Sequence, residues 1–191
     1  MSLLLHGKHG WVSRSSVAII ALSLLVLPNV SCTKTPRYSD ESFYKDVAWG
    51  IMTGLVDIYN QNIAGTPTGP VDITANGPFG GTVHITGTTS YDQVNGIETV
   101  HLQYDMTGCR ISSTHSPSDL NVDLTLDGVI SEDGTWSSTY TSLSYGSDAL
   151  DVNGVSTRGN KDRSVDDPTT FKANRTNSGT SAELFGLKVS W

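Results

Sequence analysis

The chain has little cysteine, few basic residues and no long apolar run. Its 191 residues include only two cysteines, Cys32 and Cys109, so the core must come from buried apolar side chains rather than from a disulfide framework. Lysine and arginine number 12 against 19 acidic residues, which argues against nucleic acid, a partner that requires a basic face. No apolar run approaches the roughly 20 residues that a membrane-spanning helix needs.

Recognisable catalytic motifs are also missing. Three histidines follow residue 31, namely His84, His101 and His115, and no cysteine–histidine spacing indicates a zinc site. No Gly-x-Ser-x-Gly elbow is present, and the Ser-x-x-Lys pattern from Ser42 to Lys45 lacks the companion elements that would give it meaning. We therefore predict no cofactor and no metal site, and we favour a non-enzymatic protein.

The first residues have the pattern of an export signal. Lys8 and Arg14 precede an uncharged apolar run of 11 residues, 17–27, which Pro28 ends shortly before Cys32. A positive segment followed by a short apolar segment is typical of a cleaved signal peptide and too short for a membrane anchor. We therefore predict that the signal peptide is removed.

The segment Val30-Ser31-Cys32 resembles the lipobox of bacterial lipoproteins, although Asn29 stands where that family prefers leucine. The resemblance implies that the Cys32 thiol receives a diacylglycerol and that Cys32 becomes the new N-terminus. Thr33 and Lys34 follow instead of the aspartate that retains such proteins in the inner membrane, which favours the outer membrane. An ordinary secretory signal cut near Ser31 is the alternative.

These features predict three parts, namely a signal peptide at 1–31, a lipidated tether and helix at 32–66, and an antiparallel β domain at 67–191. The part after the signal peptide has 160 residues, 10 basic and 19 acidic, which is enough for one domain with its own core. If Cys32 is acylated, we expect Cys109 to be unpaired and buried. Without acylation, a Cys32–Cys109 disulfide remains open.

The expected helix runs from Glu41 to about Ile63, with Asp40 as its cap. Gly50 and Gly54 lower helix propensity but allow close packing on a sheet, and Gly65 helps to end the helix. Its apolar side chains recur every three or four residues and form a single stripe, as one buried face of a helix requires. The stripe consists of Phe43, Val47, Ile51, Leu55 and Ile58.

Beyond Gly69 the apolar period changes to two, which indicates strands. Asn95-Gly96 is a strong hairpin signal, and it predicts a two-residue turn. Counting outward gives one apolar and one polar face. The expected pairs on the buried face include Tyr91 with Val100, Thr89 with Leu102, Gly87 with Tyr104 and Ile85 with Met106.

Three further segments contain turn signals. Glu132-Asp133-Gly134 predicts a three-residue hairpin loop, and Asn153-Gly154 predicts another turn. Residues 158–168 are rich in charge and predict a solvated loop, whose alternating oxygen side chains leave a weak calcium site open. We expect residues 182–191 to form one strand with Leu187 and Val189 facing the core.

Seven to nine short strands after one helix predict a mainly β fold. We expect an antiparallel β-sandwich or an incomplete barrel with one N-terminal amphipathic helix. The alternation that ends at Trp191 is also found in outer-membrane barrels, but aromatic residues make up only 8% of the chain, too few for aromatic girdles.

The sequence therefore predicts an exported, lipid-anchored protein of the bacterial cell envelope, periplasmic or in the outer membrane. Its partner is the membrane, through the lipid, and the β domain is expected to be a binding or structural module with a protein or an apolar ligand. One alternative is a carrier with an apolar cup lined by Ile85, Leu102, Tyr104 and Met106. The other is an enzyme with an unrecognised site.

Overall fold

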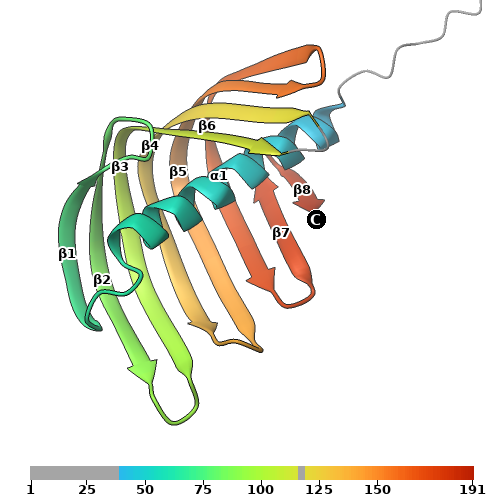
Figure 1. Ribbon diagram of the computed structural model, residues 1–191. Helices are drawn as coiled ribbons and strands as arrows, with labels where there is room; N and C mark the ends of the chain where they lie inside the picture. The colour runs from blue at the N-terminus through green and yellow to red at the C-terminus, as the bar shows by residue number, and fades with distance from the viewer. Residues whose placement is uncertain (1–38, 116–118) are drawn as a thin grey trace, which may run out of the picture. The chain divides into compact units, whose positions relative to one another are not determined.

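The computed structural model describes residues 39–115 and 119–191, which form one helix and one antiparallel sheet (Figure 1). The helix α1 comes first and is followed by eight strands in chain order. Their bounds are α1 Asp40–Asn62, β1 Gly69–Asn76, β2 Thr82–Asp92, β3 Ile97–His115, β4 Leu120–Trp136, β5 Thr141–Arg158, β6 Lys161–Thr176, β7 Gly179–Leu184 and β8 Leu187–Ser190.

The sheet is a meander in which each strand pairs with its neighbours in sequence, in the order β1 to β8. It is not closed, so β1 and β8 are its two edges. The predicted fold class, mainly β and antiparallel with one N-terminal helix, is confirmed. The described residues form one sheet rather than two, so the incomplete barrel is the nearer of the two expected arrangements.

The helix packs against one face of the sheet as its apolar stripe predicted. All five stripe residues are buried, and Ser39 rather than Asp40 caps the helix by accepting a hydrogen bond from the Ser42 backbone NH. A Cβ atom on Gly50 would lie 2.6 Å from Val122 Cγ1, and one on Gly54 would lie 2.5 Å from Ile111 Cγ2. The two glycines therefore let the helix backbone approach the sheet.

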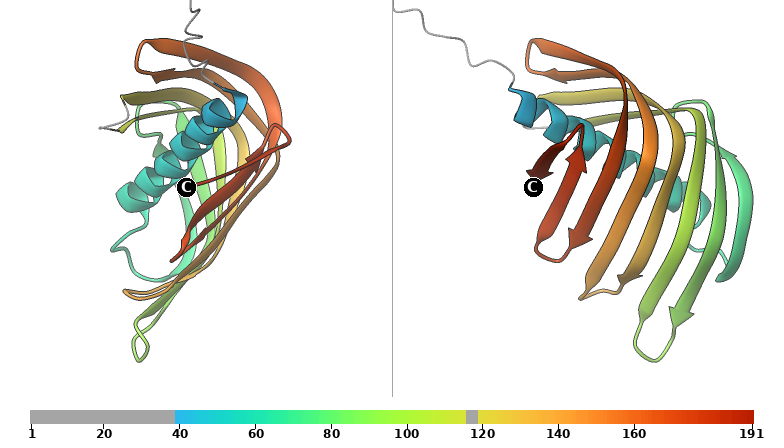
Figure 2. Two further views of the ribbon diagram at one scale, coloured as in Figure 1. Left: turned by 90° about the vertical axis from the view of Figure 1, so that its right-hand side faces the viewer. Right: turned by 180° about the vertical axis from the view of Figure 1, so that it is seen from behind.

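Two bulges allow the long middle strands to bend around α1 (Figure 2). Residues 107–108 of β3 oppose Asp127, and residues 148–149 of β5 oppose Thr170. An extra residue bends a strand and reverses which residues face the core. In β3 the buried positions accordingly change from even to odd numbers, from Met106 to Cys109.

The hairpin between β2 and β3 has the predicted faces but not the predicted register. The structure pairs Asp92 with Ile97 and Gly87 with Leu102, two residues away from the expected register, because the loop has four residues, 93–96. The Asp92 carboxylate accepts hydrogen bonds from the backbone NH groups of Val94 and Asn95 and so stabilises the longer loop. A shift of two keeps each side chain on its face, but Tyr91, which was expected to be buried, is 52% exposed near the end of β2.

The predicted turns at Glu132-Asp133-Gly134 and Asn153-Gly154 are wrong, since both segments lie within long strands. β4 continues to Trp136, and the turn to β5 consists of residues 137–140. Gly134 and Gly154 do not reverse the chain but allow a neighbouring strand to approach closely. A Cβ on Gly134 would lie 2.0 Å from the Ser142 carbonyl oxygen, and one on Gly154 2.1 Å from that of Asp123.

The predicted charged loop 158–168 is also wrong, because β6 begins at Lys161. The strand separates Asp162 from Asp166 by roughly 13 Å, at about 3.3 Å per residue, so their carboxylates do not converge as a calcium loop would require. In the described part of the chain, no group of three or more His, Cys, Asp or Glu side chains could hold a metal ion. The arginines here reach α1 instead: Arg163 lies 4.2 Å from the centroid of the Phe43 ring.

The expected single strand at 182–191 is divided into β7 and β8. Phe185, with φ of +50°, and Gly186, with φ of +74°, form a turn between them. Val189 is buried as expected, whereas Leu187 is 38% exposed, which corrects the prediction for that residue. Leu187 pairs with the buried Leu184 and shares the face of Val189, so its exposure comes from its place beside this turn on the edge strand rather than from a change of face.

Cys109 is a fully buried side chain in β3, as predicted, and it forms no disulfide with any described residue. Burial raises the pKa of its thiol to about 11, with a smaller contribution from the Asp127 carboxylate. A thiol of this kind stays protonated near neutral pH and packs as a small apolar side chain. Within the described ranges, no helix is both long enough and apolar enough to cross a membrane.

Candidate functional site

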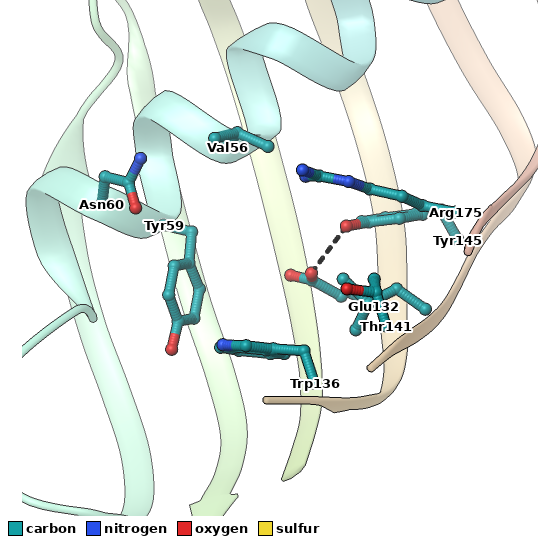
Figure 3. A pocket seen from close by; sticks show the side chains of 9 residues that line it. Val56, Tyr59, Asn60, Glu132, Trp136, Thr141, Tyr145 and Arg175 are labelled. Atoms are coloured by element: carbon teal, nitrogen blue, oxygen red, sulfur yellow. Dashed lines mark hydrogen bonds between the residues drawn. The ribbon is translucent and has the colours of Figure 1, made fainter. Parts of the chain in front are cut away.

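A hollow lies between the C-terminal half of α1 and strands β4 to β6, close to the turn that joins β4 to β5 (Figure 3). Its volume is about 250 Å³. We call it the Glu132 hollow. It is lined by Val56, Tyr59 and Asn60 from α1, Glu132 and Trp136 from β4, Thr141, Leu143 and Tyr145 from β5, and Arg175 from β6.

Glu132 is the most unusual residue of this hollow because its carboxylate is buried on the core face of the sheet. The residue is only 4% exposed. The Tyr145 hydroxyl donates a hydrogen bond of 2.8 Å to Oε1, and the Tyr104 hydroxyl donates one to Oε2. Among the described residues, no lysine or arginine lies within ion-pair distance of Glu132.

Burial raises the pKa of Glu132 and of the two tyrosines that donate hydrogen bonds to it. Loss of water around the carboxylate raises the pKa of Glu132, while the two tyrosine hydrogen bonds and the charge of Arg175 act in the other direction. Burial and the neighbouring carboxylate raise the pKa of both Tyr104 and Tyr145. These hydroxyls therefore remain protonated and act as fixed hydrogen-bond donors.

Tyr59 and Trp136 form two perpendicular aromatic walls of the hollow. Their ring centroids are 5.3 Å apart, with an angle of 84° between the ring planes. The Tyr59 hydroxyl donates a hydrogen bond to Glu98, which pairs with Trp136 across β3 and β4. Burial and the Glu98 hydrogen bond raise the pKa of Tyr59, so this hydroxyl is also held as a donor.

Arg175 supplies positive charge to the same hollow. Figure 3 shows its side chain extending beside Tyr145 toward α1, on the side of Val56. Arg175 makes no ion pair with any residue in the described ranges. Its guanidinium can therefore offer paired donors to a ligand, and the hollow presents a buried acceptor and a partly exposed cation together.

The histidines singled out in the sequence do not meet in this hollow. His84 Nε2 lies 2.8 Å from Asp72 Oδ1 and His101 Nδ1 lies 2.9 Å from Asp133 Oδ1, and all four side chains are largely exposed. These are solvated pairs between neighbouring strands. His115 packs edge to face against the Trp49 ring, with centroids 5.6 Å apart.

The proposed lipidation site, Cys32, lies outside the described residues. The expected apolar cup is filled, because its four side chains are core residues with at most 2% exposure. These are Ile85, Leu102, Tyr104 and Met106. The hollow lies instead between α1 and strands β4 to β6.

Sequence reasoning missed Glu132 because Glu-Asp-Gly is a common turn sequence. A signal for its burial was nevertheless present in the alternation of β4. Glu132 continues, in phase, the even-numbered apolar series Leu120, Val122, Leu124, Leu126 and Ile130. A carboxylate in phase with five core residues predicts a buried acid if the strand is long enough, but local turn chemistry obscured the strand's length.

No protein-family model matches this chain. Comparison with curated proteins finds no match, and comparison with solved structures finds none either. The function must therefore be argued from the site itself.

Proposed function

We propose that the protein is a lipid-anchored binding protein of the bacterial cell envelope, attached through Cys32, which takes a polar ligand in the Glu132 hollow. The anchor rests on the apolar run and the lipobox-like segment at 30–32. The binding role rests on one observation, the buried carboxylate of Glu132, which two tyrosines hold at the wall of an open hollow. A buried carboxylate without an ion-pair partner lowers stability, so its presence favours a functional role.

Binding is better supported than catalysis by the state of the ionisable groups. Tyr59 and Tyr145 are held protonated, so they can donate hydrogen bonds but cannot accept a proton as a base. The lining contains one carboxylate and no histidine, cysteine or serine, and its one threonine, Thr141, makes no hydrogen bond to Glu132. A nucleophile with an adjacent base is therefore missing from the lining of this hollow.

A polar ligand is also better supported than the apolar ligand of the alternative hypothesis. An apolar molecule in this hollow would displace water from Glu132 and Arg175 without replacing the hydrogen bonds that the water makes, which is unfavourable for both charged groups. A ligand with hydroxyl, amine or carboxylate groups would replace those hydrogen bonds. The aromatic rings of Tyr59 and Trp136 would then contact its apolar surface.

Calorimetric titration with a panel of monosaccharides, uronic acids, amino acids and oleate tests the binding role. We expect at least one polar class to bind, and we expect Trp136→Ala to weaken that binding about tenfold or more, since aromatic anchors dominate small sites. Tyr91→Ala is the matched control, because Tyr91 is an aromatic residue with 52% exposure outside the hollow. Binding of oleate alone, or equal losses in both variants, would contradict the proposal.

The anchor has a separate test in the native host. Intact-mass analysis of the membrane-extracted protein should give a chain that begins at Cys32 with added acyl mass. Cys32→Ala should release the protein from the membrane fraction, since stable attachment depends on the acyl chains. A native protein that begins at Thr33 or later, or a Cys32–Cys109 crosslink, would refute lipidation.

A further inference from the structure

The Glu132 hollow continues along α1 into two adjoining hollows, and together they form one groove. The second hollow shares Val56 and Arg175 with the first. The third shares Trp49 and Trp191 with the second. We call the three together the α1 groove.

The helix contributes a single stripe of residues to this groove. These residues recur every three or four positions, as neighbours on one side of a helix do. They run from Ser42 to Asn60, a distance of about 27 Å at 1.5 Å per residue. The stripe consists of Ser42, Lys45, Asp46, Trp49, Met52, Thr53, Val56, Tyr59 and Asn60.

All three tryptophans of the described residues line the groove and are only half-buried. Trp136 lines the first hollow, and Trp49 and Trp191 line the second and third. Indole rings with a free face pack against the apolar CH faces of sugar rings, while neighbouring polar side chains bind the hydroxyl groups. Repeated indoles along a groove, with Thr53 beside Trp49 and Trp191 and with Asn60 in the hollow of Trp136, fit a chain of such rings.

The charge of the groove is opposite to that of the whole chain. The Asp46 carboxylate accepts hydrogen bonds from Nε and Nη2 of Arg158, so these two opposite charges balance. The remaining charged side chains of the lining are the cations Lys45 and Arg175 and the single carboxylate of Glu132. The chain as a whole carries a net charge of −7. Local positive charge in an acidic protein favours a ligand that carries negative charge.

We propose that the α1 groove binds a linear acidic oligosaccharide, a chain of sugar rings that carry carboxylates. This inference rests on the proposed binding function of the Glu132 hollow and extends it to the neighbouring two. Arg175 lines both the first and the second hollow, so it can bind a carboxylate bidentately from either side. Glu132 accepts hydrogen bonds from hydroxyl groups, and the indoles bind the ring faces.

Two other chain-like ligands fit the groove less well. An acyl chain would take water away from the side chains of Arg175 and Lys45 without offering them any hydrogen-bond acceptor. An extended peptide is usually recognised by the backbone groups of a free strand edge. Side chains of α1 and of the helix-covered face of the sheet line this groove, which suits recognition of rings and hydroxyls.

Titration calorimetry with hyaluronan oligosaccharides, compared with neutral chito-oligosaccharides of equal length, tests the inference on the mature protein. We expect the hexasaccharide to bind about tenfold more tightly than the disaccharide, because it reaches the second and third hollows. Trp191→Ala should remove most of this gain while leaving disaccharide affinity within about twofold. Arg175→Gln should abolish the preference for carboxylated over neutral chains.

Tyr91→Ala is again the matched control, and circular dichroism should verify that every variant is folded. Lys45→Gln provides a second charge variant at the far end of the groove and should weaken only the longer acidic chains. Disaccharide binding without a gain in affinity for longer chains would overturn the groove while leaving the Glu132 hollow intact. Equal affinity for neutral chains would overturn the acidic assignment, and binding of amino acids alone would overturn the saccharide class.

Discussion

Replacing Leu102 by alanine should lower the free energy of unfolding by about 2–5 kcal/mol, the range for deletion of a fully buried leucine side chain. Leu102 lies on β3 beneath α1 and is 2% exposed. The removed methyl groups would leave a cavity that the neighbouring core side chains cannot fill without moving. Urea unfolding followed by circular dichroism will measure the change.

The adjacent Gln103 provides the control for this experiment. It points to the opposite, exposed face of β3, so Gln103→Ala should change the unfolding free energy by no more than about 0.5 kcal/mol. Similar losses for both variants would show that β3 does not alternate between core and solvent as described. The pair therefore tests the face assignment that the sequence and the structure share.

Glu132→Ala should destabilise the protein by about 2–5 kcal/mol, because it leaves the buried hydroxyls of Tyr104 and Tyr145 without their acceptor. Glu132→Gln is the matched comparison, since its amide keeps the shape and can still accept one hydrogen bond. We expect this variant to be at least as stable as the native protein at neutral pH while binding ligand more weakly. Chemical denaturation and ligand titration of both variants will separate the two effects.

The pH dependence of stability gives Glu132 a second signature. Burial raises the folded-state pKa of Glu132 above its ordinary value of 4.5. Above about pH 4.5 the unfolded chain therefore loses this proton more readily than the folded protein, and the native unfolding free energy falls as the pH rises toward the folded-state pKa. Glu132→Gln lacks this loss, so its stability relative to the native protein should increase from acid to neutral pH. A constant difference would contradict a buried, ionisable Glu132.

The binding proposal implies that the Glu132 carboxylate lowers the stability of the protein and is kept because it binds the ligand. A core optimised for stability alone would place an apolar side chain at residue 132, in phase with Ile130 of the same strand. The chain instead keeps a carboxylate with two tyrosine donors beside a hollow that also contains Arg175. A gain of stability with a loss of binding in Glu132→Gln would be the expected result of such a balance.

Periodicity in the sequence was sufficient to predict which side chains face the core. The stripe of α1 and the alternation of β2 and β3 both appear in the structure, because helix and strand geometry repeat at 3.6 and 2 residues. The hairpin register was wrong by two residues, yet Leu102 and Tyr104 remain buried. A shift by one full strand period changes the partners but not the faces.

Glycine was ambiguous in the sequence, and this ambiguity accounts for the misplaced turns. Gly134 and Gly154 follow acidic or amide residues, as turn glycines do, but each lies where a neighbouring strand's carbonyl leaves no room for a Cβ atom. Gly50 and Gly54 were interpreted correctly because the helical period around them was unambiguous. An Asp-Gly or Asn-Gly pair has the same local sequence in a turn and at a place where two strands approach closely. Only the position of the neighbouring strand distinguishes the two cases.

The sequence by itself therefore determined the helix, the alternating faces and the antiparallel mainly β class, because these depend on local periodicity. Tertiary structure alone decided the length of β4 to β6, the bulges that bend the sheet around α1, and the meeting of Glu132, Trp136 and Arg175 beside the helix. These features depend on contacts between strands that are distant in the chain. The candidate site belongs to this second group, since burial of Glu132 and openness of its hollow both require the helix to lie across the sheet.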